Sequence, residues 1–317
     1  IKSLLSTRVT LPPLVHYPGY VIGTYFYAFY ANYIYWLLNA PIILWKILTV
    51  YINLKILLSG VFFGIITYLY LYIEFIKKNE IFPDKALSKK LFFISIVFFF
   101  FGYSIFLTNG NVGFSSTGMD NRVAIAAAIG VTLTILGLIG YILKYFFEGL
   151  LFKKMYILCI SLISVFSFLI INTIAIFWIE SYTYTLSLTK QLKKDVPNVP
   201  SNSTILFDGM CTYIGPASTI TARWDARGIV QLLYKDNTLQ GNIIRPNTYI
   251  NHSGIHTQIY SFKNTYPYKN LYLYNFKLSQ YYDMNSFEKA SEYFTRTKKS
   301  YSNSCPSTRD GYGADIF

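Results

Sequence analysis

Long hydrophobic segments fill the first part of the chain, and polar positions become ordinary only near residue 180. Segment 155–178, MYILCISLISVFSFLIINTIAIFW, carries no charge and is long enough to cross a bilayer. Comparable segments with few charges are 21–40, 56–76, 91–108 and 122–147. This pattern predicts a membrane α-helical bundle of about five transmembrane helices.

The first two of the earlier segments leave alternatives open. Segment 21–40 is rich in Tyr and contains Trp36, so it either spans the membrane or lies at the interface that these rings prefer, and we expect it to span. Segment 41–55 starts at Pro41 and contains Lys46 and Lys55. It either extends the preceding helix after a kink or runs along the membrane surface.

Segment 122–147 differs from the others because its first half consists of small residues. Ala126 and Gly130 are four positions apart, a spacing that lets two helix backbones approach each other closely. We therefore expect this helix at the centre of the bundle.

The charges between the segments predict an orientation. Loops 77–90 and 144–154 are short and rich in Lys, so both are expected on the cytoplasmic or matrix-like side. Loop 109–121 and everything after Trp178 then lie on the opposite side, with the N-terminus inside. Lys46 and Lys55 fall on the unfavoured side in this arrangement.

Beyond residue 180 the pattern is that of a small α/β domain outside the membrane. We divide the chain into a transmembrane domain, 1–179, and an exoplasmic or periplasmic domain, 180–317. Segment 183–194 continues the last span as an amphipathic stalk that Pro197 and Pro200 stop. The other predicted elements are strands at 203–209, 257–262 and 271–278, a helix capped by Asp225 that runs to Tyr234, and a helix with capping-box spacing at Asn285 and Glu288.

Composition narrows the classes of partner. The net charge of +13 would suggest nucleic acid in a soluble protein. Here Lys and Arg flank the hydrophobic spans, as the positive-inside bias requires, so the expected partner is the lipid bilayer and no nucleic acid is expected.

Three cysteines and three histidines occur in the chain. Cys159 lies inside a span as an apolar filler, whereas Cys211 and Cys305 both lie in the outer domain and could pair in an oxidising compartment. Alternatively, Cys211 and Cys305 are two unpaired thiols. His252 and His256 are four positions apart, but Gly254 between them favours a loop, so we expect polar loop residues and no metal or cofactor.

Two places gather side chains that could bind a polar ligand. The outer loop ends at Asp120 and Arg122, which suit either a lipid headgroup or a helix cap with an interfacial anchor. Segment 208–228 combines carboxylates, arginines and an aromatic ring, which suit carbohydrate or phosphate but also a well-tied surface loop. The candidate binding residues are Asp120, Arg122, Asp208, Arg223, Trp224 and Asp225.

The passage FWIESYTYTLSLTKQLKKDVPNVPSNSTILFDG, at 177–209, resembles the junction between span and outer domain in bacterial multi-pass membrane proteins with a C-terminal periplasmic α/β domain. Over 90–317 the layout is similar to the C-terminal part of GT-C-type membrane glycosyltransferases. That resemblance implies work on lipid-linked sugars. The family places its catalytic acids in an early outer loop, whereas residues 1–55 contain no Asp or Glu. Either the chain is part of a longer enzyme or it is not such an enzyme, and no catalytic residue is carried over.

Two functions follow as hypotheses. The first is an integral membrane protein of the cell envelope, in the bacterial inner membrane, that handles lipid-linked sugars or glycans through its outer domain. The second is a non-catalytic subunit of a membrane complex, for instance a respiratory one in the mitochondrial inner membrane. A coupled transporter is disfavoured because the spans carry almost no interior ionisable groups.

Overall fold

The structure is a computed structural model and describes residues 17–51, 53–77, 85–104, 128–245, 247–259 and 262–297. The chain divides into two compact units, Ile1–Ala175 together with Phe317, and Ile176–Ile316. The sequence-based division lay a few residues later, between 179 and 180.

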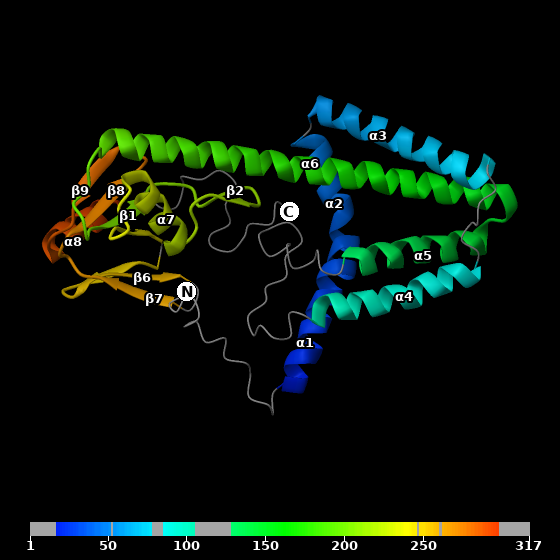
Figure 1. Ribbon diagram of the computed structural model, residues 1–317, viewed down its shortest axis with the longest axis horizontal. Coiled ribbons are helices and arrows are strands. Elements are labelled where there is room, and N and C mark those ends of the chain that lie inside the picture. Colours follow the sequence, from blue (N-terminus) through cyan, green and yellow to red (C-terminus); the bar gives the residue numbers. More distant parts are fainter. Residues whose placement is uncertain are drawn as a thin grey trace. The chain divides into compact units, whose positions relative to one another are not determined.

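Helices form the described part of the first unit (Figure 1). They are α1 (Tyr17–Phe29), the π-helix η2 (Tyr30–Tyr35), α2 (Trp36–Thr49), α3 (Leu54–Tyr72), the π-helix η3 (Ile73–Lys77), α4 (Lys85–Ser104), α5 (Ala128–Phe146) and the start of α6 (Gly149–Asp195). Among the described residues, four helical segments are long and apolar enough to cross a membrane: Leu54–Lys77, Ala86–Ser104, Ala128–Phe146 and Gly149–Asp195. Their length and composition indicate an integral, multi-pass membrane protein.

The predicted span 21–40 is not one of these four segments. It is divided among α1, η2 and α2, and helix continues through Pro41 to Thr49. Of the two expectations for 41–55, the extended helix is therefore found up to Thr49. The next helix, α3, begins after Asn53, whose side-chain oxygen accepts hydrogen bonds from the N–H groups of Lys55 and Ile56. A fifth crossing stays a prediction.

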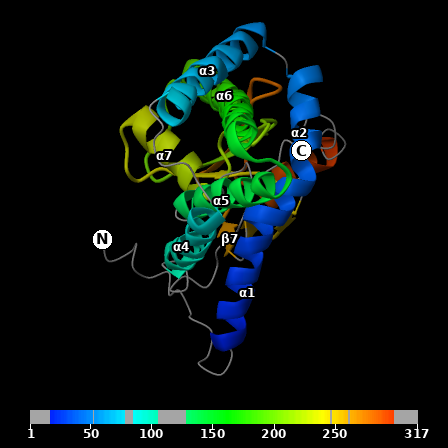
Figure 2. The same cartoon turned by 90° about the vertical axis from the view of Figure 1, so that its right-hand side faces the viewer.

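Close backbone contact joins α4 and α5, which lie side by side in both overall views (Figure 1, Figure 2). A Cβ atom placed on Gly130 would lie 2.7 Å from the backbone nitrogen of Phe99, and one on Gly137 would lie 3.0 Å from the carbonyl oxygen of Ser88. The absence of side chains at these positions lets the two backbones meet. Ala126, the predicted partner of Gly130 in this spacing, lies outside the described residues.

Polar side chains add specific contacts to the same helices. The hydroxyl of Thr134 on α5 donates to Ser95 on α4 at 2.8 Å and lies 3.0 Å from the hydroxyl of Tyr33 on η2. The amide of Asn32 donates to the hydroxyl of Tyr103 at 2.5 Å. Hydrogen bonds between helices are worth about 1 kcal/mol each in a membrane. These contacts join α5 to α4 and η2, and the central place expected for this helix stays a prediction.

A mostly parallel sheet is the centre of the second unit. Its strands are β1 (Thr204–Asp208), β4 (Gln240–Ile243), β8 (Leu271–Asn275) and β9 (Gln280–Asp283), in the order β4-β1-β8-β9. β1 is parallel to both β4 and β8, and β9 is antiparallel to β8. Two smaller antiparallel groups are the hairpin of β2 (Tyr213–Ile214) with β3 (Ala217–Ser218) and a sheet of β5 (Tyr249–Asn251), β6 (Gly254–Ile259) and β7 (Phe262–Tyr266).

Both faces of the main sheet are covered. Along β1, Ile205 and Phe207 join one apolar core, whereas Leu206 joins the core on the opposite face, as the two-residue period of a strand requires. Helix α7 (Arg223–Tyr234) contributes Val230 to the first core, and α8 (Phe287–Thr297) contributes Ala290 to the second. The predicted buried strand at 203–209 and the α/β class are confirmed.

The last apolar span continues without a break into the second unit, since α6 is a single helix of 47 residues. The sequence suggested an amphipathic stalk here, but the final turns of α6 pack into the domain. Leu188 and Leu192 are buried in the first core, and Asp195 accepts a hydrogen bond from the hydroxyl of Tyr274 on β8. The amphipathic pattern of this segment therefore buries its apolar side against the domain's own sheet.

Several local predictions are wrong. Segment 257–262 is not one strand, because β6 ends at Ile259 and β7 begins at Phe262 in a hairpin. Asn285 does not begin the last helix: Ser286 precedes it, and its hydroxyl accepts from the N–H of Lys289 at 3.4 Å. Asn285 instead donates to Asp283 at 2.8 Å. Strands β2, β3, β4, β5 and β9 were not predicted, and the strand predicted at 271–278 ends at Asn275.

Candidate functional site

The carboxyl edge of the parallel strands carries a buried polar cluster. Asp208 ends β1 and Asn275 ends β8, and these two residues are partners in the register of the strands. The hydroxyl of Tyr293 on α8 donates to the carboxylate of Asp208, and the amide of Asn275 donates to the oxygen of Tyr293 at 2.7 Å. The edge beyond the carboxyl ends of parallel strands is where open α/β sheets bind ligands.

Burial governs the electrostatics of this cluster. Asp208, Asn275 and Tyr293 are each at most 4% exposed. Burial raises the pKa of Tyr293 above the usual range, and the neighbouring negative charge of Asp208 raises it further. The second carboxylate oxygen of Asp208 accepts the N–H of Gly209 at 2.5 Å. One carboxylate oxygen thus joins β1 to α8, and the other accepts from the backbone that follows β1.

Asp225 accepts hydrogen bonds from the backbone just before α7. Helix α7 begins at Arg223, three residues earlier than a cap at Asp225 would allow, so that predicted cap position is wrong. The preceding residue, Ala222, has no side-chain acceptor. The carboxylate of Asp225 instead accepts from the N–H groups of Thr221 and Ala222, each at 3.0 Å, from inside the first turn.

Arg223 and Trp224 form the exposed part of the same turn. The guanidinium of Arg223 donates to the side-chain oxygen of Asn264 on β7 at 2.7 Å. Trp224 is 59% exposed, an unusual fraction for so large a ring. A fixed guanidinium, an amide and an indole face at one surface can satisfy hydroxyl groups and cover an apolar ring face of a ligand.

The predicted site residues therefore fall into separate groups. Arg223, Trp224 and Asp225 share the first turn of α7, whereas Asp208 belongs to the cluster with Asn275 and Tyr293. Asp120 and Arg122 lie outside the described residues, so their role stays a prediction. Sequence reasoning missed Asn275 and Tyr293. Asn275 ends the apolar strand LYLYN, which was the available signal, but nothing local points to Tyr293.

The β2–β3 hairpin rests on α6 where the hydrophobic span ends. A Cβ atom on Gly215, whose φ is +55°, would lie 2.6 Å from the ring of Phe177, so only glycine allows this contact. The hydroxyl of Ser181 donates to the carbonyl oxygen of Ser218, and the N–H of Cys211 donates to the hydroxyl of Tyr184 at 3.1 Å. We call Phe177, Ser181 and Tyr184 with this hairpin the α6 collar.

The cysteines follow the expected pattern as far as they are described. Cys159 is a free thiol, whereas Cys211 is disulfide-bonded. Cys305, its predicted partner, lies outside the described residues, so this pairing stays a prediction.

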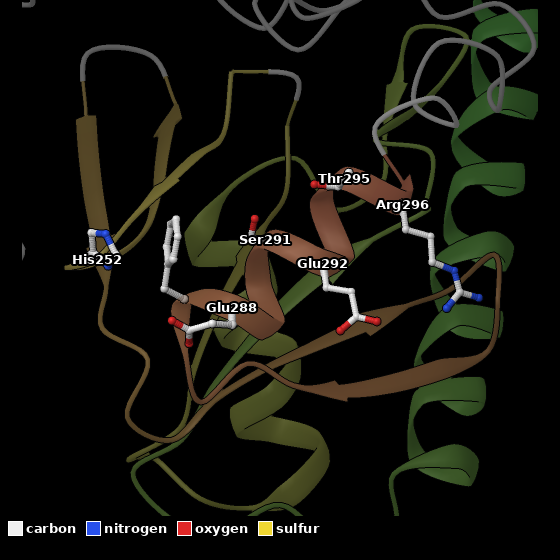
Figure 3. A pocket seen from close by; sticks show the side chains of 7 residues that line it. His252, Glu288, Ser291, Glu292, Thr295 and Arg296 are labelled. Carbon is white, nitrogen blue, oxygen red and sulfur yellow. The ribbon is translucent and has the colours of Figure 1, made fainter.

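An open pocket of about 660 Å³ lies along the exposed side of α8 (Figure 3). The ring of His252 closes one end, with its centroid 4.4 Å from that of Phe287. Figure 3 shows Glu288, Glu292 and Arg296 on successive turns of α8. The mixed charges suit no single ligand class.

The two histidines have different surroundings. His252 lies in the turn after β5, but His256 is part of β6 rather than a loop, which corrects the prediction. His256 Nε2 lies 2.9 Å from the side-chain oxygen of Asn251, and Nδ1 lies 2.9 Å from the hydroxyl of Thr265. Within the part of the chain that the structure describes, no group of three or more His, Cys, Asp or Glu residues could hold a metal ion.

These features define a class of protein: a multi-pass helical membrane protein whose last long helix enters a small α/β domain. Comparison with protein-family models, with curated proteins and with solved structures found no match for the chain. A proposal about its function therefore rests on the fold, on the cluster around Asp208 and on the first turn of α7.

Proposed function

We propose that the protein resides in a cell-envelope membrane, with its C-terminal α/β domain on the outer side, and binds lipid-linked sugars or other glycans there. The site proposed for the sugar is the exposed first turn of α7, with Trp224 and Arg223. The proposal concerns binding and assigns no catalytic residue.

The α6 collar is the observation that carries this proposal. Gly215 lies against Phe177, one residue before the end of the uncharged segment 155–178, and Ser218 contacts Ser181 one turn later. Trp178 is 41% exposed, and Trp prefers the interface between hydrocarbon and water. These contacts support a position of the β2–β3 hairpin at the membrane boundary, within reach of lipid headgroups.

The orientation is supported by charge. Lys144, Lys153 and Lys154 precede the span of α6, and this short basic stretch is expected on the cytoplasmic side. The disulfide at Cys211 suits an oxidising compartment on the other side. A bacterial inner membrane satisfies both conditions.

Ligand binding is tested with the full chain in nanodiscs. The probes are a polyprenyl phosphate that carries one hexose and the same hexose as a free oligosaccharide. We expect Trp224→Ala to weaken binding of the lipid-linked probe by about tenfold or more, because exposed Trp residues often dominate a binding site. Leu232→Ala is the matched control, since Leu232 lies on the same helix and is 82% exposed. Equal affinity of wild type and Trp224→Ala, or no binding of either probe, would contradict the proposal.

A non-catalytic subunit of a larger membrane complex is the second candidate. Asp208 and Asp225 are the predicted acidic ligands of segment 208–228, but both accept hydrogen bonds that hold the domain together. A structural role for these carboxylates favours a subunit over a protein that binds a ligand through them. Native gel electrophoresis of mildly solubilised source membranes tests it. A discrete complex well above the 36.5 kDa of the chain would support it, and migration as a lone chain in its micelle would count against it.

A further inference from the structure

Two tripeptides in the outer domain have the pattern Asn-X-Ser/Thr, in which X is not proline. They are Asn202-Ser203-Thr204 and Asn251-His252-Ser253. This pattern is the acceptor for Asn-linked glycosylation when it faces a compartment that holds the transferring enzyme. The structure allows each asparagine to be tested for access.

Both asparagines are exposed at chain turns. Asn202 lies between α6 and β1, with a φ of +60°, and its backbone N–H donates to the hydroxyl of Thr238 at 2.8 Å. Asn251 ends β5 and starts the turn into β6. Glycans require such sites because a bulky hydrated group cannot be buried in a core.

The reacting atom is available in each case. The side-chain oxygen of Asn251 accepts the N–H of Ser253 at 2.9 Å and its hydroxyl at 2.7 Å. Within the described residues, the Nδ2 atoms of Asn202 and Asn251 make no hydrogen bond. A sugar attached to Nδ2 would therefore leave the turn at Asn251 intact, since the turn uses only the oxygen.

Position relative to the membrane also suits a membrane-bound transferase. Asp195, the last residue of α6, lies 17 positions after Trp178. A helix rises about 1.5 Å per residue, so this end lies about 25 Å beyond the end of the span measured along the helix. Asn202 follows a few residues later in the chain.

We infer that Asn202 and Asn251 are acceptor sites for Asn-linked glycans, supplied by a lipid-pyrophosphate-linked oligosaccharide. In the transfer, the side-chain Nδ2 forms a bond to the anomeric carbon of the first sugar. The bond from that carbon to the pyrophosphate oxygen breaks, the lipid pyrophosphate leaves, and Nδ2 loses one proton to a base of the transferase. The inference rests on the proposed outer position of the domain.

Translation of the full chain into sealed mammalian microsomes tests the inference. We expect two steps of reduced gel mobility, both removed by peptide-N-glycosidase, which leaves aspartate at the two positions in a peptide mass spectrum. Asn202→Gln and Asn251→Gln should each remove one step. Asn237→Gln is the matched control, because Asn237 is exposed and the residue two positions later is Leu239.

A second measurement separates failure of the inference from failure of the orientation. In a Cys159→Ala background, Leu232→Cys reports the side of the domain to an impermeant maleimide. Labelling only after the microsomes are opened, with neither asparagine modified, would overturn the inference and leave the orientation standing. Labelling of sealed microsomes without glycosylation would overturn both.

Discussion

The hydroxyl of Tyr293 donates a hydrogen bond to the carboxylate of Asp208, although the two residues are 85 positions apart in the chain. The contact ties α8 to the end of the central strand β1. Because both residues are buried, the bond has no competing water and its loss leaves a carboxylate oxygen poorly satisfied. This relationship makes α8 part of the folding unit of the C-terminal domain.

Removal of that hydroxyl is the first test. We expect Tyr293→Phe to lower the stability of the outer domain by about 1–3 kcal/mol, because a buried hydrogen bond to a charged acceptor is lost. The measurement is urea unfolding of the full chain in detergent, followed by near-ultraviolet circular dichroism. Tyr282→Phe is the control, since its hydroxyl donates to the exposed side chain of Gln280. Equal midpoints for the two variants would contradict the assignment.

Alkaline pH should destabilise the same domain. Burial raises the pKa of Tyr234 to about 12, and burial also raises the pKa values of Tyr274 and Tyr293. An unfolded tyrosine has a pKa of about 10, so above that pH the folded state binds more protons than the unfolded state. Stability is therefore full below about pH 10 and falls as the pH rises further.

The pH prediction is checked by the melting temperature of the full chain in detergent between neutral and strongly alkaline pH. The absorbance of tyrosinate in the same samples should show some tyrosines that ionise well above pH 10 in the folded protein. On unfolding, these tyrosines should ionise near pH 10. A melting temperature that stays flat well above pH 10 would rule out this linkage.

The glycine contact between α4 and α5 is open to a direct test. Gly130→Ala places a methyl group where backbone atoms of Phe99 and Ser95 lie within 3 Å, so the helices must separate. Overpacking of this kind costs about 1–3 kcal/mol. Gly23→Ala is the matched control, because a Cβ atom at Gly23 on α1 meets nothing within 4 Å. Thermal unfolding in detergent should show a lower midpoint for Gly130→Ala alone.

The disulfide prediction needs peptide mapping. Nonreducing mass spectrometry should find a peptide that links Cys211 to Cys305. Closing a loop of this length stabilises a fold by about 4 kcal/mol in the chain-entropy model, so reduction should lower the melting temperature of the outer domain. Cys211 linked to any other thiol, or found reduced, would refute the pairing.

The class of fold was open to prediction because it depends on long one-dimensional patterns. A long uncharged run such as 155–178 forms a helix in a bilayer, because its backbone N–H and C=O groups find no partners in lipid and must bond to one another. Strand 203–209 was predictable for a similar reason, since an apolar run between turn residues is typical of a buried strand. The single strand predicted at 257–262 was wrong because β6 and β7 pair as two antiparallel strands, and their alternating residues gave no sign of a break between them.

The candidate site was only partly predictable. Asp208 was found because it follows an apolar strand, and Trp224 because a large ring stands beside charges. Asp225 was given a capping role at the wrong position, since Ala222 has none of the side chains that signal a helix start. The strand order brings Asn275 on β8 beside Asp208, and the packing of α8 on the sheet brings Tyr293 to it.

The sequence by itself determined that this chain has apolar spans, a basic flank at the last of them and an α/β domain beyond. Hydrophobicity and charge act locally, so they can be read along the chain. Only the tertiary structure decided that the end of α6 is part of the domain core and that the carboxylate of Asp208 is held by Tyr293. These facts depend on which segments pack together, and that choice is made by the burial of apolar faces from distant parts of the chain.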